Sequence, residues 1–343
     1  MKNLLPTVLP LALLMLSGCA VIAGKEENID PAKHAVTIRF VESLRSEQSL
    51  RGEGWMEPRH NTPPATFLQR PNSVFADAFR VYVTDTYTSS SMTSPRVIIF
   101  DRGERTMKVL PLPAPPAEGK LIAPAAIAVD LANMIYVADS QQGLVFGYDL
   151  KGALLMVLGR AGDVGKPVAL AVDRARGWLY VADAAGHQVK IFTTLGNLVA
   201  NLGDPSNPDQ DFRYPAAMTV DRNGRLYVLD SRGKRVYVYD HDRKFVQRFS
   251  LRGGADTSPV KPRGIAVDSE GNVYVTDMFS NTVLIYDRDG ALVQSWGRTG
   301  SMIGDFWSPI GISIDNRDQV YIADEMNSRV QVFQLQKMPV PVP

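Results

Sequence analysis

One sequence pattern recurs six times between residues 71 and 334, and it constrains the fold more than any other feature. Each unit begins at a proline, continues as a small apolar segment that ends in Asp, and then reaches a Tyr-containing segment and an alternating one. The clearest unit reads Pro262-Arg-Gly-Ile-Ala-Val-Asp268, then Tyr274-Val-Thr-Asp277, then Val283-Leu-Ile-Tyr-Asp287. A period near 47 residues with several short strands per unit is typical of a β-propeller. The units start at Pro71, Pro124, Pro167, Pro215, Pro262 and Pro309.

Each unit predicts a blade of four antiparallel strands. The first strand consists of small apolar residues, which suit the narrow centre of a propeller. Tight-turn pairs follow it, as at Asn223-Gly224 and Glu270-Gly271, and these favour a hairpin. After the third strand a further turn leads to an outer strand such as 291–296. The chain is therefore predicted to be all-β, with a six-bladed β-propeller of four-stranded blades over residues 71–334.

The sixth unit lacks an outer strand of its own. Only a proline-rich tail, residues 335–343, follows its third strand. Residues 35–41, Ala-Val-Thr-Ile-Arg-Phe-Val, form a strand candidate that has no partner nearby in the sequence. We predict that this N-terminal strand is the fourth strand of the last blade, so that the ring closes without an open edge. Residues 42–70 would then be an irregular segment that crosses to the first blade.

The repeated frame Pro-x-Gly-Ile-Ala-Val-Asp, then Tyr-Val-Ala/Thr-Asp, then Asn-His-Arg/Leu-Val resembles the NHL repeat. The resemblance covers residues 71–334 and implies a propeller of the NHL type. Individual units depart from the pattern, since only Asn327 keeps its Asn and only His187 keeps its His. The first unit also carries an insertion rich in Ser and Thr at 86–95. Because a fold does not determine a function, the chemistry has to be sought in individual residues.

The N-terminus has the features of a secretory signal. Lys2 precedes an apolar run, and small residues follow that run at its end. The segment Leu16-Ser17-Gly18-Cys19 resembles the lipobox of bacterial lipoproteins, and Cys19 is the only cysteine in the chain. The resemblance implies that residues 1–18 are a signal peptide and that lipid on Cys19 anchors the mature protein. Residues 19–34 would then be the lipidated cysteine and a polar tether.

The whole layout, a lipobox, an N-terminal strand and six NHL units, resembles a group of bacterial six-bladed propeller lipoproteins. The resemblance implies a lipid-anchored protein of the bacterial cell envelope. Ala20, rather than Asp, follows the lipid site, which implies the outer membrane if the host is Gram-negative. Some members of the group are encoded near multihaem cytochromes, so such a cytochrome is one partner that the resemblance implies.

Composition excludes several kinds of site. A single cysteine allows no intrachain disulfide, cysteine-based zinc site, iron–sulfur cluster or c-type haem attachment. The formal net charge is +1 at pH 7, and a chain without a basic excess is a poor binder of nucleic acid. The loop that contains Arg232, Lys234 and Arg235 is therefore interpreted as a solvated turn. The sequence predicts no cofactor and no nucleic-acid partner.

Two sets of aspartates recur with the repeat, and both are interpreted as structural. An Asp that ends a strand accepts hydrogen bonds from the backbone amides of the next turn, and every blade needs such a cap. The alternative, a ring of carboxylates that binds a cation, is weaker because a functional site usually breaks the repeat symmetry. The sets are Asp85, Asp139, Asp183, Asp230, Asp277 and Asp324, and Asp77, Asp130, Asp173, Asp221, Asp268 and Asp315.

A metal-dependent propeller enzyme needs polar ligands that point into the central channel. The residues that follow the repeat prolines are mostly apolar. The four histidines either precede the propeller or lie in its loops and turns. We therefore predict no catalytic and no metal-binding residue. The channel residues are Asn72, Ala125, Val168, Ala216, Arg263 and Ile310, and the histidines are His34, His60, His187 and His241.

Apolar loop residues of the last two units are the candidates for partner contact. Their loops are predicted to open on one face of the propeller, and exposed Met and aromatic side chains favour contact with a partner. The alternative is local packing. Phe306 and Phe212 each lie three residues before a repeat proline, so Phe306 is interpreted as structural. The candidates are Met278, Phe279, Met302, Ile303, Trp307 and Met326.

These observations favour a lipid-anchored NHL propeller that serves as a protein-binding or scaffolding module of the bacterial cell envelope. Its partner would be an envelope or extracellular protein. The alternative is a propeller enzyme, either a calcium-dependent hydrolase or a metal-dependent lyase, with its site at the central channel. A third possibility is a structural protein of the envelope that has no discrete ligand.

Overall fold

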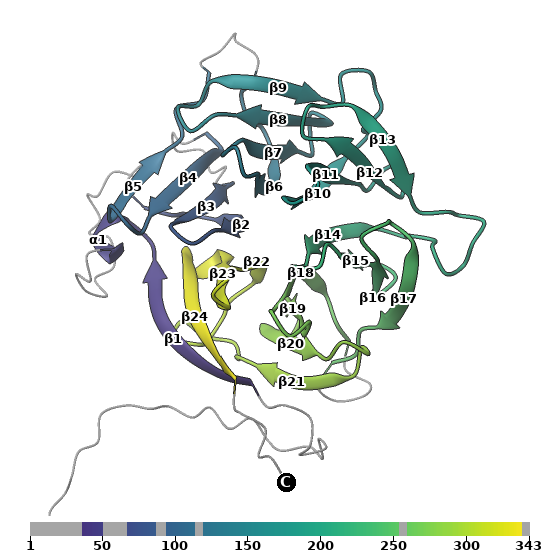
Figure 1. Ribbon diagram of the computed structural model, residues 1–343. Helices are drawn as coiled ribbons and strands as arrows, with labels where there is room; N and C mark the ends of the chain where they lie inside the picture. Colours follow the sequence, from purple (N-terminus) through teal and green to yellow (C-terminus); the bar gives the residue numbers. More distant parts are fainter. Residues whose placement is uncertain (1–35, 51–66, 87–93, 114–118, 254–258, 338–343) are drawn as a thin grey trace, which may run out of the picture.

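The computed structural model describes residues 36–50, 67–86, 94–113, 119–253 and 259–337. In these ranges 24 strands form six four-stranded antiparallel sheets, which are arranged as blades around a central axis (Figure 1). The prediction of an all-β, six-bladed propeller is confirmed. No helix of the described ranges has the length and apolar character that crossing a membrane requires. The predicted signal peptide, Cys19 and the tether lie outside the described residues.

Five blades use four consecutive strands, with the first strand nearest the axis. Blade 1 contains β2 (Pro71–Ala76), β3 (Arg80–Asp85), β4 (Arg96–Asp101) and β5 (Thr106–Val109). Blade 2 contains β6 (Pro124–Val129), β7 (Ile135–Asp139), β8 (Leu144–Tyr148) and β9 (Leu154–Leu158). Blade 3 contains β10 (Pro167–Asp173), β11 (Trp178–Asp183), β12 (Gln188–Thr193) and β13 (Leu198–Leu202). Blade 4 contains β14 (Pro215–Val220), β15 (Leu226–Asp230), β16 (Arg235–Tyr239) and β17 (Phe245–Ser250). Blade 5 contains β18 (Pro262–Val267), β19 (Val273–Asp277), β20 (Thr282–Tyr286) and β21 (Leu292–Trp296).

Blade 6 is built from both ends of the described chain. Its strand order is β22 (Pro309–Ile314), β23 (Gln319–Asp324), β24 (Arg329–Lys337) and then β1 (Val36–Leu44). The prediction that an N-terminal strand closes the ring is therefore confirmed. The strand continues three residues past the predicted end, because residues 42–44 pair with Val332, Gln331 and Val330 beyond a bulge.

The segment that crosses from blade 6 to blade 1 is less irregular than predicted. It contains the short helix α1 (Glu47–Leu50) and a β-bridge between Ser46 and Phe67. In addition, β24 extends to Lys337, past the predicted end of the last unit at residue 334, because its final residues pair with the start of β1.

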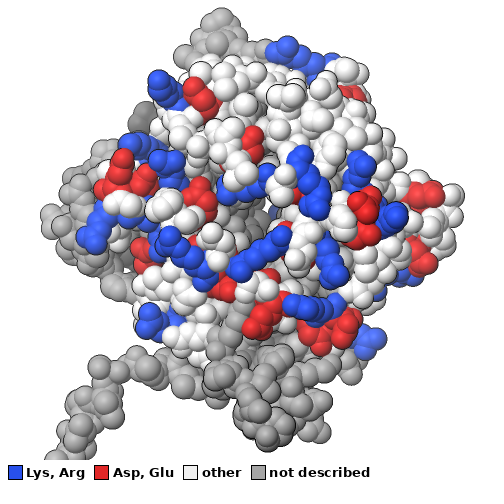
Figure 2. Space-filling model, viewed as in Figure 1, with Lys and Arg blue, Asp and Glu red and all other residues white. Residues whose placement is uncertain are grey.

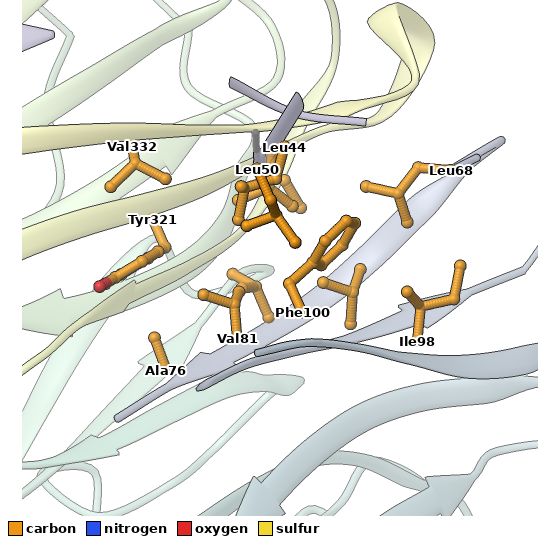
Figure 3. Close-up of a cluster of buried hydrophobic side chains, with 13 residues drawn as sticks. Leu44, Leu50, Leu68, Ala76, Val81, Ile98, Phe100, Tyr321 and Val332 are labelled. Atoms are coloured by element: carbon orange, nitrogen blue, oxygen red, sulfur yellow. The ribbon is translucent and has the colours of Figure 1, made fainter. Parts of the chain in front are cut away.

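Apolar side chains fill the space between neighbouring blades. The seam between blade 6 and blade 1 holds a cluster that includes Leu44, Leu68, Phe100 and Tyr321 (Figure 3). All four are fully buried. We call β1 the clasp strand, because it closes the ring. Leu44 belongs to the clasp strand and Phe100 to blade 1, so burial of this apolar surface holds blade 6 against blade 1.

The two sets of aspartates cap turns, as predicted. Asp183, for example, accepts hydrogen bonds from the backbone N–H groups of Gly165, Lys166, Ala185 and Gly186, at 2.8–3.2 Å. It thus joins the turn after β11 to the connection that enters its own blade. Burial by itself would raise the pKa of Asp183, but the hydrogen bonds from Gly165, Lys166 and Gly186 outweigh it and hold the pKa below the ordinary aspartate value.

The propeller has two different ends. At the upper end, as we define it, lie the connections between blades and the turns between second and third strands. At the lower end lie the hairpin turns that join first to second and third to fourth strands. Figures 1 and 2 view the lower end. The paired residues Val36 and Lys337 lie at the lower end, so the chain enters the clasp strand there.

Candidate functional site

Five of the six predicted contact residues have exposed side chains at the upper end of blades 5 and 6. Their exposed fractions run from 42% for Ile303 to 69% for Met302. Met278, the sixth, is half-buried. The structure therefore brings most of the predicted set to one surface. We call it the apolar patch, and it consists of Phe279, Met302, Ile303, Trp307 and Met326.

Three of the patch residues, Met302, Ile303 and Trp307, belong to the loop of residues 297–308 that connects β21 to β22. Phe279 and Met326 belong to the turns on either side of it. Hydrogen bonds join this loop to the turns on both sides. On blade 5, Asn281 accepts a bond from the Ser308 N–H at 2.8 Å and donates one to Thr299 Oγ1 at 3.0 Å. On blade 6, the Asn327 side chain donates to the Gly300 carbonyl at 2.9 Å. The three segments that carry the patch are thus one connected unit.

Arg329 holds the loop 297–308 through hydrogen bonds to its backbone, and the Arg329 side chain is fully buried. Its Nε lies 2.7 Å from the Asp324 carboxylate, which is also fully buried. Its two terminal nitrogens donate to the carbonyls of Ser301, Met302 and Asp305, each at 2.9 Å. Five donors in a planar fork suit this task, because one guanidinium can satisfy a carboxylate and several loop carbonyls together. Sequence reasoning missed Arg329, although it occupies the Arg position of the repeat.

Arg96 has the same role in blade 1. It is nearly buried, and its Nη2 donates to Asp85 at 2.8 Å and to the Phe67 carbonyl at 2.7 Å. In blades 1 and 6 the arginine at this repeat position therefore ties a capping aspartate to the segment that enters the blade. Burial raises the pKa of Asp324, the partner of Arg329, while the Trp307 N–H and Arg329 act in the opposite direction.

Charged and buried side chains surround the patch. Arg70 forms an ion pair with Glu325 at 2.7 Å and lies 3.8 Å from the Met326 sulfur. Phe306 is fully buried and packs edge-on against Trp296, with ring centroids 5.4 Å apart. The interpretation of Phe306 as a structural residue is therefore confirmed.

A cavity of about 550 Å³ opens along the axis at the upper end. The six residues that follow the repeat prolines all line it, as the prediction required, and they are mostly apolar. The charged side chains in its lining are Lys166 and Arg263, and the lining contains no Asp or Glu. Sequence reasoning noted Arg263 only as one member of that ring and missed Lys166.

The lower end has a larger cavity of about 940 Å³ with a different character. Figure 2 shows Lys and Arg side chains gathered around the central opening, with acidic side chains between them. Several of these cations are paired with carboxylates: Arg80 with Asp101, Arg176 with Asp173, and Arg222 with Asp318. This surface is therefore internally neutralised to a large extent.

Among the described residues, no three His, Cys, Asp or Glu side chains lie close enough together to hold a metal ion. The His187 ring nitrogen Nδ1 lies 2.9 Å from the Arg213 carbonyl at the protein surface. His241 lies in an exposed turn 3.5 Å from Asp242. The other two histidines, His34 and His60, lie outside the described residues.

Two protein families match parts of the chain. The family described as SMP-30/Gluconolactonase/LRE-like region matches residues 208–303, and the NHL repeat matches residues 306–333. No curated protein matches the chain significantly.

Several solved structures have a similar fold. An auxiliary nutrient binding protein from Bacteroides thetaiotaomicron VPI-5482 is 11% identical, with a TM-score of 0.62 over 88% of this chain and 77% of that one. Another, from Bacteroides ovatus ATCC 8483, is 12% identical, with a TM-score of 0.61 over 88% and 78%. Virginiamycin B lyase from Staphylococcus aureus is 10% identical, with a TM-score of 0.56 over 88% and 100%. At these identities the likeness shows the fold alone. With six four-stranded blades and a matching repeat, the chain is an NHL-repeat six-bladed β-propeller.

Proposed function

We propose that this protein is a binding module of the bacterial cell envelope, anchored by lipid on Cys19, and that the apolar patch is its contact surface for an envelope or extracellular protein. One observation carries the proposal. Five large apolar side chains are exposed at the upper end of blades 5 and 6, three of them on the loop 297–308 that the buried Arg329 holds in place and two on the turns bonded to that loop.

The composition of the patch fits a protein contact. Aromatic residues and Met are enriched in the centres of protein interfaces, and contiguous exposed apolar groups on a soluble surface commonly mark such sites. Phe279 and Trp307 supply large side chains of the kind that dominate binding energy. Because the loop is already fixed by hydrogen bonds, a partner does not have to order it, and the entropic cost of association is smaller.

The position of the patch fits an anchored protein. The clasp strand β1 begins at the lower end, where Val36 pairs with Lys337. A lipid tether that precedes Val36 would therefore leave from the end opposite the patch. The names of the two Bacteroides neighbours, which describe binding proteins, agree with a binding role.

The test is a crosslinking pull-down of the full lipidated protein from its native membrane, analysed by mass spectrometry. We expect one envelope or extracellular protein at close to one copy per propeller, a multihaem cytochrome being one identity that the family resemblance implies. The variants Phe279→Ser and Trp307→Ser should lose it. Leu195→Ser is the matched control, because Leu195 is 83% exposed but lies at the lower end of blade 3. Recovery of abundant background proteins alone, or equal loss in the control, would contradict the proposal.

A further inference from the structure

The cavity at the upper end has the size of a small-molecule site. Its volume of about 550 Å³ falls within the usual range for ligand pockets. All six inner strands contribute to its wall, and each strand has a register shift immediately after its repeat proline. The residue at this position leaves the regular ladder and lines the cavity. The side chains at these six positions therefore form part of the cavity wall, together with residues of the connections between blades.

The charge of the cavity is positive. Lys166 on the connection into blade 3 and Arg263 on β18 both have exposed side chains that line it. Neither has an acidic partner among the described residues. The carboxylate of Asp183, which is close in the fold, is buried and accepts four backbone hydrogen bonds, so it is directed into its turn. Two cations without a counter-ion in a recess favour an anion there.

The remaining wall combines apolar surface with a few polar groups. Ala125, Val168 and Ile310 supply apolar contacts and Gln141 supplies an amide group, while the Asn72 amide nitrogen donates to the Pro124 and Ala125 carbonyls. At the edge, Tyr214 lines the cavity while the guanidinium of Arg232 lies over its ring at 5.3 Å. This wall suits a ligand that has an apolar body and one charged end better than it suits a free inorganic ion.

We propose that the upper cavity binds a small organic carboxylate, whose charged group lies between Lys166 and Arg263 and whose body contacts the apolar wall. The cavity and the apolar patch share no residue. This proposal therefore goes beyond the protein-binding role, and either one can fail while the other stands.

Isothermal titration calorimetry of the full chain tests the proposal with two pairs of nearly isosteric probes, benzoate against benzamide and butyrate against butyramide. We expect at least one carboxylate to bind with a Kd of about 1 mM or lower, and at least tenfold more tightly than its amide. Lys166→Gln and Arg263→Gln should each weaken that binding by about fivefold or more. Lys120→Gln is the matched control, because this exposed cation also lies at the upper end but does not line the cavity.

Three results would overturn the proposal: neither carboxylate binds below about 10 mM, the amides bind equally well, or the variants at Lys166 and Arg263 bind as the wild type does. Inorganic phosphate is a fifth probe: binding of phosphate with no binding of either carboxylate is a form of the first result, and it would assign the cavity to an inorganic anion. The same two variants should retain the protein partner in the pull-down, which separates this test from that of the apolar patch.

Discussion

Replacement of Arg329 by Met is the sharpest test of how the upper end is held. The change keeps much of the side-chain volume but removes the guanidinium that joins Asp324 to three loop carbonyls. Asp324 would retain its bonds from the Trp307 N–H and from Asn327, so its turn should persist. The loop 297–308 would lose its bonds to Arg329 and keep those of the buried Gln331 side chain, which accepts from the Gly304 N–H and donates to the Asp305 carbonyl.

The expected cost follows from burial. Both members of the Arg329–Asp324 pair are fully buried, and loss of one member of such a pair costs about 3–5 kcal/mol, because the remaining charge stays in the interior without its partner. The Ser301 carbonyl would also lose its donor, whereas the Met302 and Asp305 carbonyls keep bonds from the Asp305 N–H and from the Gln331 side chain, so we do not expect the cost to exceed that range. By contrast, Arg70→Met breaks a pair whose cation is 46% exposed, so we expect a cost below about 1 kcal/mol.

Urea unfolding followed by circular dichroism measures both variants against the wild type. We expect a clear loss of unfolding free energy for Arg329→Met and a small one for Arg70→Met. Arg329→Lys should fall between the wild type and Arg329→Met, because an ammonium keeps a positive charge for Asp324 but cannot also reach the three carbonyls. Equal stability of the Met variants at positions 329 and 70 would refute the reasoning from burial.

Two further predictions concern the clasp and the caps. Leu44→Ala should lower the unfolding free energy by about 2–5 kcal/mol, because Leu44 is fully buried in the cluster between blades 6 and 1. Val41→Ala, at a position 36% exposed, should change it by less than about 1 kcal/mol. Equal unfolding free energies of the two variants in urea would contradict this prediction. The pKa of Asp183 is lowered in the folded protein, so its contribution to stability is present above the unfolded aspartate pKa and is lost as pH falls below about 4 towards the folded value. The melting temperature of Asp183→Asn, measured at a series of pH values, should therefore depend less on pH in this acid range than that of the wild type. An unchanged pH dependence would count against the cap.

Much of the fold could be predicted because its determinants are local. Each blade is a run of consecutive short strands whose turns carry Gly, Asn or Asp. Because the unit repeats, a strand that is hard to recognise in one unit can be placed from the equivalent strand in the others. The end of β1 was harder to place, because residues 42–44 pair with residues at the other end of the chain beyond a bulge. The alternation of apolar and polar residues within one segment does not indicate pairing with a segment at the other end of the chain.

The site was only partly predictable, for a related reason. Large apolar residues in loops can be recognised in the sequence, and five of the six predicted residues are indeed exposed. Arg329 escaped notice because arginine is usually a surface residue and its acceptors are backbone carbonyls, which have no signature in the sequence. Lys166 and Arg263 belong to different blades, and that both line one cavity follows only from the arrangement of the blades around the axis.

The clasp also determines how the molecule would yield to tension. A pull on the chain ahead of Val36 first loads the pair of Val36 with Lys337, at the very end of the β1–β24 ladder. The hydrogen bonds of that ladder would then break one after another from this end. They would not share the load, as they do when two strands are pulled in opposite directions along their length. The seam between the last and first blades would open while the other five blades remain folded, and it would expose the unpaired edge of β24. If the protein is anchored as proposed, the strand that closes the ring is also the strand that bears the load.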